Sequence, residues 1–253
     1  GPAGLEAARV AAIKGHNVTL FEKEKVLGGQ LNIAEVPPRK SEIYRAVQNL
    51  EHAITTQGVT LRLGEIATTQ EVLALTPDAV IVAVGATNFI PPIPGVDGAN
   101  VCDAWQVLAG EQEVHGRVAV IGGGLVGCET AEYLAMQGCK VTLVEMLGKI
   151  ADGISSTVLP TLLENYRSYG VAQLAEHKVT SIAIGELRCD DKIGNAVKIP
   201  CDYIVMASGA RPVSFDTTAF RDKNIDVIKV GDCSEVADIS HAIKTAYDAA
   251  NAL

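Results

Sequence analysis

Arg117-Val-Ala-Val-Ile-Gly-Gly-Gly-Leu-Val-Gly127 determines how this chain must fold. The apolar run 118–121 predicts a buried strand, residues 128–137 have a helical pattern, and 141–145 again predict a strand. Gly122, Gly124 and Gly127 form G-x-G-x-x-G at the strand-to-helix junction, and an acid, Glu145, follows Gly122 by 23 residues. A glycine turn alone is weak evidence, but this context is the one that a dinucleotide-binding fingerprint requires.

Each residue of the fingerprint has a physical role. Gly122 permits the tight turn, Gly124 leaves room for a pyrophosphate, and Gly127 lets the helix pack closely on the sheet. The helix N-terminus supplies free N–H groups and a partial positive charge for phosphates. The motif therefore predicts a nucleotide site; the competing interpretation is a glycine turn beside a surface acid.

Glu145 predicts which nicotinamide cofactor binds. A carboxylate at the end of the second strand accepts hydrogen bonds from a ribose 2′-OH but repels a 2′-phosphate. The following residues, Met146 and Leu147, provide no arginine to hold such a phosphate. We therefore expect NAD(H) rather than NADP(H).

Composition excludes several classes of protein. The 253 residues are 48% hydrophobic and carry a net charge of −9, which makes nucleic acid an unfavourable partner. No uninterrupted apolar run reaches the roughly 18 residues of a membrane span. The six cysteines are scattered without C-x-x-C, so we expect neither a metal site nor a redox pair, and free thiols favour a cytoplasmic protein.

An internal repeat reveals a second nucleotide site. Shifting the chain by 123 residues superposes Gly1, Gly4 and Glu22 on Gly124, Gly127 and Glu145, with ten identities in twenty-two positions. The counterpart of Gly122 and the strand before it are absent. We therefore expect a first unit that lacks its first strand, and a chain truncated inside a motif.

A second repeat supports the first. Residues 78–86 superpose on 202–210 with a shift of 124, and both segments are buried-strand patterns that end in a small-residue turn, at Gly85 and Gly209. Two such units imply two nucleotides, most simply FAD and NAD(H).

Other segments complete the predicted order of elements. The first unit should contain a helix over 1–14, a strand over 18–22 and a helix from Ser41, its expected cap, to 55. Residues 100–116 are expected to be a linker with a short helix. Two further motifs indicate ligand contacts: the glycine loop with Gly29 and Gln30, and Gly231-Asp232 at a strand end, where an ordinary turn aspartate is the alternative.

Together these motifs resemble the two-dinucleotide flavoproteins of the glutathione-reductase-like class. The phrases Val36-Pro-Pro38, Trp105-Gln-Val-Leu108 and the fingerprint with Cys128-Glu-Thr-Ala-Glu132 are similar more specifically to the C-terminal region of old-yellow-enzyme-related NADH:flavin oxidoreductases. That group includes 2,4-dienoyl-CoA reductase, 2-enoate reductase and trimethylamine dehydrogenase. The resemblance covers essentially the whole chain and implies an α/β fold with two Rossmann-like units.

The resemblance also implies roles and partners. The first unit (1–110 and 211–253) would bind FAD, with Asp232 on the ribityl chain and a helix from about Ser240 directed at the flavin; the second (111–210) would bind NADH. Glu129 would reach the nicotinamide amide, with a helix-surface acid as the alternative. His241 could lie near the flavin, although a capping or surface histidine is the simpler interpretation. The partner would be an N-terminal barrel with FMN and a four-iron cluster, outside this chain. The oligomeric state is left open, and a homo-oligomer is compatible with the resemblance.

The expected activity is hydride transfer from NADH to FAD and onward transfer of electrons to the FMN barrel, as in an ene-reductase or NADH oxidase. The protein would position the cofactors, so no catalytic acid–base pair is expected. Two alternatives remain: a structural module that holds a nucleotide such as ADP without redox turnover, and a free-standing NADH:acceptor reductase.

Overall fold

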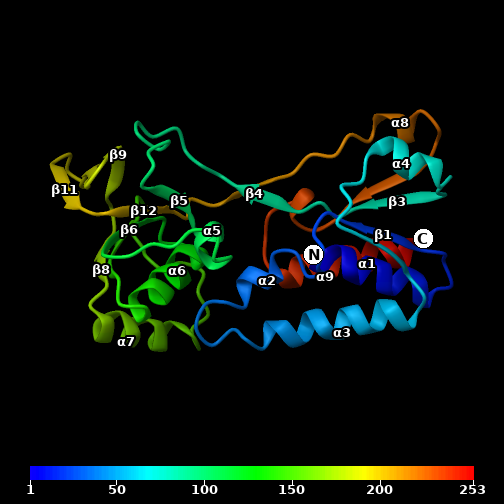
Figure 1. The fold of residues 1–253 in the computed structure, drawn as a ribbon, viewed down its shortest axis with the longest axis horizontal. Helices are drawn as coiled ribbons and strands as arrows, with labels where there is room; N and C mark the ends of the chain where they lie inside the picture. Colours follow the sequence, from blue (N-terminus) through cyan, green and yellow to red (C-terminus); the bar gives the residue numbers. More distant parts are fainter. The chain divides into compact units, whose positions relative to one another are not determined.

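The computed structural model describes residues 1–253, which form two compact units (Figure 1). Unit 1 comprises 1–35, 41–87 and 210–253, and unit 2 comprises 36–40 and 88–209. Each unit contains one copy of the internal repeat. None of the helices combines the length and the apolar character that a membrane crossing requires.

Unit 2 is built on a parallel sheet of five strands in the order β5-β12-β6-β7-β8. The fingerprint strand lies at the centre of this sheet, between the return strand and the strand that precedes Glu145. The strands are β5 (Val101–Asp103), β6 (Arg117–Ile121), β7 (Lys140–Val144), β8 (Ala172–Leu174) and β12 (Tyr203–Met206).

The sheet of unit 2 is covered on both faces because successive side chains of a strand point to opposite sides. Val118 and Val120 of β6 pack in the cluster formed with the helices, whereas Ala119 and Ile121 pack in the cluster formed with a small antiparallel sheet. The helices are α5 (Ala104–Leu108), α6 (Leu125–Met136) and α7 (Leu159–Tyr169), and the small sheet consists of β9 (Lys178–Ala183), β10 (Glu186–Asp190) and β11 (Ala196–Pro200).

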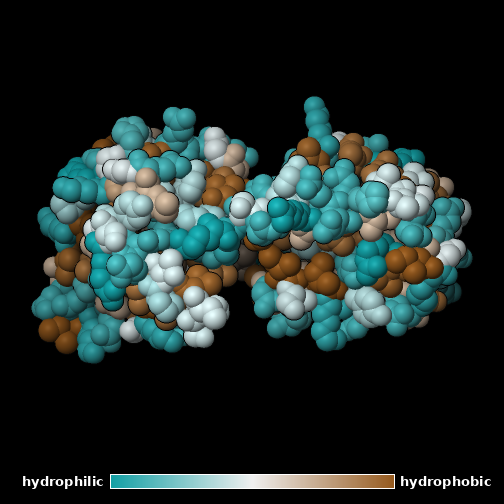
Figure 2. Space-filling model, turned by 90° about the horizontal axis from the view of Figure 1, so that it is seen from below, coloured by the Kyte–Doolittle hydropathy of each residue, from teal (hydrophilic) through white to brown (hydrophobic).

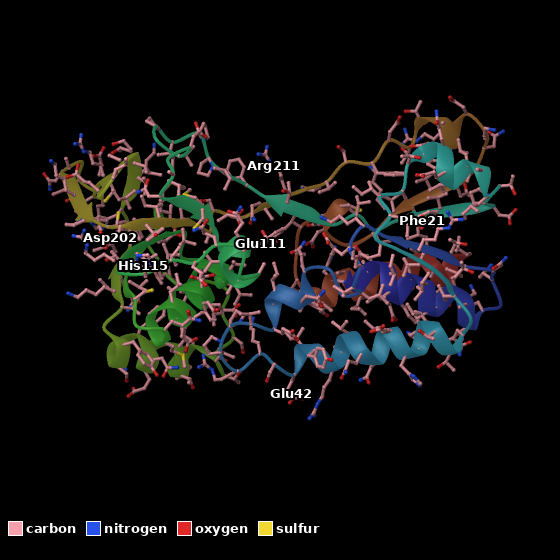
Figure 3. All side chains as sticks on the ribbon, viewed as in Figure 1. Phe21, Glu42, Glu111, His115, Asp202 and Arg211 are labelled. Carbon is pink, nitrogen blue, oxygen red and sulfur yellow. The ribbon has the colours of Figure 1, made fainter.

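The return strand β12 is anchored at its start by charge. The Arg117 guanidinium donates to Asp202 over 2.6 Å and holds the pKa of that carboxyl at about 2. The His115 ring lies edge-on to Tyr203, with 5.0 Å between the ring centroids. Figure 3 labels His115 and Asp202 close together in unit 2. This end of the sheet is the one opposite the fingerprint turn, so its charges stabilise the strand register rather than a ligand.

Unit 1 is organised around α1 (Pro2–Ile13), whose small residues allow close packing on two sides. Ala3, Ala7 and Val10 face α9, and Leu5 and Ala8 face α3. The remaining helices are α2 (Leu31–Ala34), α3 (Ile43–Thr56), α4 (Thr69–Ala74), α8 (Thr218–Arg221), the short 3-10 helix η1 (Gly231–Cys233) and α9 (Ile239–Ala252).

The strands of unit 1 form two separate parallel pairs instead of one sheet. β1 (Thr19–Glu22) pairs with β2 (Thr60–Leu63), and β3 (Ala79–Val82) pairs with β14 (Asp226–Lys229). Arg62 of β2 lies over the Phe21 ring of β1, with 5.3 Å between its guanidinium carbon and the ring centroid. Figure 3 labels Phe21. A third pair joins β4 (Ala86–Asn88) to β13 (Ala210–Pro212).

The repeat explains why unit 1 has no continuous sheet. Its strands β1 and β3 correspond to β7 and β12, which in unit 2 pair with the two edges of β6. No strand of this chain corresponds to β6 in unit 1. Gly4 of α1 packs between β1 and the end of β3, because a Cβ there would lie 3.5 Å from Ala83 and 3.6 Å from Leu20. The expected absence of a first strand therefore leaves β1 and β3 with one unpaired edge each.

The structure confirms the two-unit α/β fold and corrects three details. The segment 100–116 contains β5 as well as its short helix, because Val101–Asp103 pairs with β12 and joins the sheet. Residues 88–110 consequently pack in unit 2. Ser41 is not the cap of α3, which begins after Glu42 without any side-chain cap. The strand β10 lies in a segment where none was expected.

The unpaired edges predict unequal local stability. Without added nucleotide, we expect the amides of β1 and β3 to exchange with deuterium at least about tenfold faster than those of β6 and β7, because fewer neighbouring hydrogen bonds must break. Hydrogen-exchange mass spectrometry measures both sets in one experiment, with unit 2 as the internal control. Equal protection of the two sets would contradict this expectation.

Candidate functional site

The fingerprint turn in unit 2 is packed so tightly that two of its glycines cannot be replaced without collision. Gly122 has a φ of +111°, and a Cβ there would lie 2.3 Å from the carbonyl oxygen of Ala207. A Cβ at Gly127 would lie 1.8 Å from the carbonyl oxygen of Gly122. These contacts hold the start of α6 against the ends of β6 and β12.

Gly124 differs from its neighbours, because a Cβ there would meet no atom within 4 Å. It is exposed, has a φ of −74°, and is the N-cap of α6 without any side-chain cap. The first N–H groups of the helix therefore point into open space, where an anion can accept their hydrogen bonds. The next two side chains, Leu125 and Val126, are exposed apolar groups beside this opening.

Glu145 is held in place by the fingerprint turn itself. Its Oε2 accepts a hydrogen bond of 2.6 Å from the Gly123 N–H, and its Oε1 accepts one of 2.6 Å from the Leu147 N–H. A carboxylate has about four acceptor positions, so both oxygens retain capacity for hydroxyl donors. Met146 and Leu147 are 59% and 64% exposed, which leaves an apolar surface next to the carboxylate.

Glu129 lies one turn after the start of α6. It is not a helix-surface acid, since only 14% of its side chain is exposed. It forms an ion pair with Lys40. Burial raises the pKa of Glu129, while the hydrogen bond and the charge of Lys40 oppose that rise. The residue is thus a partly accessible carboxylate with a cation supplied by a distant segment of sequence.

The turn after β12 closes the site in unit 2. The Ala207 N–H donates to the carbonyl of Ile121 over 2.8 Å, and Gly209 has a φ of +98°. Ser208 Oγ is buried there without a hydrogen-bond partner. A polar atom of this kind beside the fingerprint turn fits a region that receives polar ligand groups.

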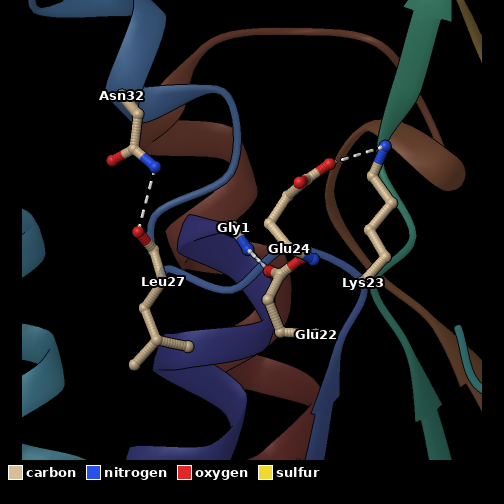
Figure 4. A network of polar contacts seen from close by, with 6 residues as sticks. All are labelled: Gly1, Glu22, Lys23, Glu24, Leu27 and Asn32. Carbon is tan, nitrogen blue, oxygen red and sulfur yellow. Dashed lines mark hydrogen bonds and ion pairs between the residues drawn. The ribbon is translucent and has the colours of Figure 1, made fainter. Parts of the chain in front are cut away.

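In unit 1 the corresponding turn brings together segments that are far apart in sequence. Gly29 lies against Gly1: a Cβ on Gly29 would be 2.7 Å from the Gly1 Cα. The glycine loop is closed by Asn32, whose Nδ2 donates to the Leu27 carbonyl over 3.0 Å (Figure 4). Backbone thus approaches backbone at the start of α1, as it does at α6.

Glu22 occupies the position of Glu145. Its Oε2 lies 3.3 Å from the Gly1 amino group, and its Oε1 accepts from the Glu24 N–H over 3.1 Å (Figure 4). The end of β1 and the start of α1 are therefore adjacent, which repeats the arrangement of acid and glycine turn found in unit 2.

Gln30 and Asp232 lie together in unit 1, although 202 positions separate them. The Gln30 Nε2 donates to Asp232 Oδ2 over 3.3 Å, and a Cβ on Gly85 would lie 3.7 Å from that Nε2. Gly231, with a φ of +60°, lets this turn approach α1, because a Cβ there would be 2.9 Å from the Ala3 Cβ. The expected contacts Gly29, Gln30, Gly85 and Asp232 thus form one cluster.

The helix after this turn begins at Ile239, close to the expected start. Its N-cap is Asp238, whose Oδ1 accepts from the His241 N–H over 2.7 Å. His241 is therefore part of the capped first turn of α9. No metal-ligand cluster of His, Cys, Asp or Glu is found in the chain.

All six cysteines are buried free thiols. Burial raises the pKa of Cys102 and that of Cys201 to about 11, which keeps these thiols protonated at neutral pH. Cys102 and Cys201 therefore behave as small packed side chains.

The sequence analysis did not identify the two basic residues that form ion pairs with the glutamates of α6. Arg39 and Lys40 follow two prolines in the segment 36–40, which packs in unit 2 although its neighbours in sequence belong to unit 1. Two glutamates three positions apart on a buried helix were the available signal, because buried carboxylates require counter-charges.

Nearly the whole of this chain is similar to part of several longer known proteins. Residues 1–215 match the family model described as pyridine nucleotide-disulphide oxidoreductase. The chain is 53% identical to bilirubin reductase of Mediterraneibacter gnavus (strain CC55_001C), over 100% of its own length and 40% of the relative. It is 39% identical to NADH oxidase of Thermoanaerobacter brockii, over 99% of its length and 39% of that protein.

A solved structure agrees with these relatives. The structure of a 2-naphthoyl-CoA reductase complex superposes with a TM-score of 0.89 at 27% identity, over 98% of this chain and 38% of that one. The chain spans about two fifths of the length of these proteins. The resemblance to old-yellow-enzyme-related NADH:flavin oxidoreductases is confirmed, and the chain belongs to the pyridine nucleotide-disulphide oxidoreductase family.

Proposed function

We propose that this chain is the NAD(H)- and FAD-binding part of a larger NADH:flavin oxidoreductase of the ene-reductase type. The observation that carries the proposal is the open, uncapped N-terminus of α6 at Gly124, with Glu145 fixed beside it by the Gly123 N–H. When both cofactors are bound, NADH supplies a hydride and FAD accepts it.

In unit 2, we assign the pyrophosphate of NADH to the N–H groups that follow Gly124, and the adenosine ribose to Glu145. The exposed side chains of Met146 and Leu147 would cover the adenine. We assign the nicotinamide amide to Glu129, the partly accessible carboxylate of α6.

In unit 1, we assign the FAD pyrophosphate to the turn at Gly1 and Gly4, and its adenosine ribose to Glu22. Gln30, Gly85 and Asp232, which lie together, would contact the ribityl–flavin half. The N-terminus of α9 would contribute its partial positive charge at this end.

The remaining electron carriers and partners also belong to this proposal. The relatives are more than twice as long as this chain, which supports a partner barrel with FMN and an iron–sulfur cluster in the parent enzyme. A homo-oligomer is compatible with this arrangement. Six free thiols support a cytoplasmic location.

The alternative is a module that holds a nucleotide such as ADP without redox turnover. A spectroscopic experiment on the intact parent enzyme separates the two. We expect the purified enzyme to absorb visible light as a flavoprotein and to bleach when NADH is added without oxygen. An enzyme without flavin absorption, or with a flavin that NADH leaves oxidised, would favour the alternative.

Gly124 and Gly127 provide a matched pair of tests. We expect Gly124→Ala to cost at most about 1 kcal/mol of stability, since only cap preference changes, but to weaken NADH binding at least about tenfold by filling the pyrophosphate space. Gly127→Ala should instead cost about 3 kcal/mol or more, because its Cβ collides with backbone. Thermal unfolding and NADH titration measure the two effects. Unchanged NADH affinity in Gly124→Ala would contradict the site.

Glu145→Ala tests the choice of cofactor. Hydrogen bonds between a carboxylate and ribose hydroxyls contribute about 1.5–3 kcal/mol, so the preference for NADH over NADPH should fall at least about tenfold. The exposed Glu164 of α7 offers a control, Glu164→Ala, with the same loss of charge in the same unit. If Glu145→Ala keeps the wild-type preference in steady-state kinetics with both cofactors, the role given to this carboxylate is wrong.

A further inference from the structure

A hollow of about 250 Å³ lies in unit 2 beyond the end of β8, the edge strand of the sheet. It adjoins the turn that carries Glu145, because the His177 N–H donates to the carbonyl of Glu145 over 2.9 Å. The Glu176 N–H donates to the carbonyl of Leu147, also over 2.9 Å. The hollow is therefore beside the carboxylate assigned to the adenosine ribose. Its lining comes from the segment after β8 and from the turn between β10 and β11: Ala175, Glu176, His177, Asp191, Lys192 and Ile193.

Lys192 is presented to the hollow by a turn that its neighbour Asp191 holds closed. The Asp191 N–H donates to the carbonyl of Asn195 over 3.0 Å. Asp191 Oδ1 accepts from the N–H groups of Ile193 and Asn195 over 3.0 and 2.8 Å. These bonds occupy the Asp191 carboxylate within the turn. Lys192 pairs instead with the segment after β8, and its Nζ lies 3.0 and 3.1 Å from the two carboxylate oxygens of Glu176.

Stability does not explain the pair between Glu176 and Lys192. Glu176 has a φ of 58°, in the left-handed region that a residue with a Cβ seldom occupies. The two side chains are 43% and 65% exposed, and an ion pair in such contact with water contributes little to stability. An unfavourable backbone conformation that supports a weakly stabilising contact is a feature that functional sites retain.

The cations around Glu145 decide whether a ribose 2′-phosphate can bind there, because ammonium groups form strong charge-assisted hydrogen bonds with phosphate. Lys149, four positions after Glu145, is paired with Asp152 over 2.7 Å. Lys192 is the lysine that lines the hollow, and both oxygens of Glu176 engage it. A 2′-phosphate would therefore meet the carboxylates of Glu145 and Glu176 and an ammonium group that is already engaged.

We propose that Glu176 is a specificity-determining residue for the nicotinamide cofactor: by holding the Lys192 ammonium on both carboxylate oxygens, it withholds from a ribose 2′-phosphate the cation that would bind it. This inference rests on the function proposed for unit 2, in which Glu145 binds the adenosine ribose. Glu145 disfavours NADPH by repulsion, whereas Glu176 does so by removing a favourable partner of the phosphate.

The test compares wild type with Glu176→Gln, Lys192→Met, the double variant and Glu186→Gln. Glu186 is the control, because it also forms ion pairs in unit 2, with Arg188 and Lys198, but does not line the hollow. Equilibrium titration of the full chain with NADH and with NADPH, followed by the fluorescence of the reduced nicotinamide, measures the two affinities. The two cofactors differ only in the 2′-phosphate, so their ratio isolates its contribution.

We expect Glu176→Gln to strengthen NADPH binding about fivefold relative to NADH binding, because the released ammonium can contact the 2′-phosphate. Lys192→Met should weaken NADPH binding relative to NADH binding, since the Glu176 carboxylate then lacks its counter-charge. The double variant and Glu186→Gln should keep the wild-type ratio within about twofold. The gain in Glu176→Gln should shrink as ionic strength rises, because exposed charges are screened by salt.

Three results would overturn the proposal. The first is an unchanged ratio in Glu176→Gln, the second is an equal gain with and without Lys192, and the third is a gain that salt leaves unchanged. In each case wild type still binds NADH, so the function proposed for unit 2 stands. A wild-type chain that binds neither NADH nor NADPH would instead refute that function, and this inference with it.

Discussion

The close approach of Gly127 to the carbonyl oxygen of Gly122 is the constraint on which unit 2 depends. A Cβ would lie 1.8 Å from that oxygen, so α6 can rest on the sheet only because the side chain is absent. The same approach directs the uncapped helix end past Gly124 and brings Gly123 within hydrogen-bonding distance of Glu145. The fold and the proposed nucleotide site therefore depend on the same contact, because the contact that packs the helix also leaves its N-terminus open to an anion.

The charges on α6 follow from the same geometry. A helix packed this closely buries one face, and two of the residues on that helix are carboxylates. Buried carboxylates without counter-ions would destabilise the unit. The segment 36–40 meets this requirement with two adjacent cations, and Asn165 donates a hydrogen bond to Glu132. The segment 36–40 is thus tied to unit 2 by electrostatics, whereas its neighbours α2 and α3 pack in unit 1.

Much of this arrangement could be predicted from sequence, because glycine spacing and strand periodicity are local signals. The fingerprint, the repeat, the return strands and the missing first strand all follow from such patterns. β5 could not be predicted, since three residues carry no periodicity and their pairing is decided by β12. β10 did carry a signal, as Leu187 and Cys189 alternate with exposed or half-buried residues. Lys40 was missed because its partner lies 89 positions away and no local pattern joins them.

The divided sheet of unit 1 leaves a strand edge to which further polypeptide can pair. β3 is a run of four apolar residues, Ala79–Val82, and one of its edges has no partner within this chain. An unpaired apolar strand edge is a template for extended polypeptide, and charged side chains are the usual protection against such pairing. Neither charge nor proline interrupts β3, so along this edge the backbone N–H and C=O groups are open to pairing with an extended segment of polypeptide.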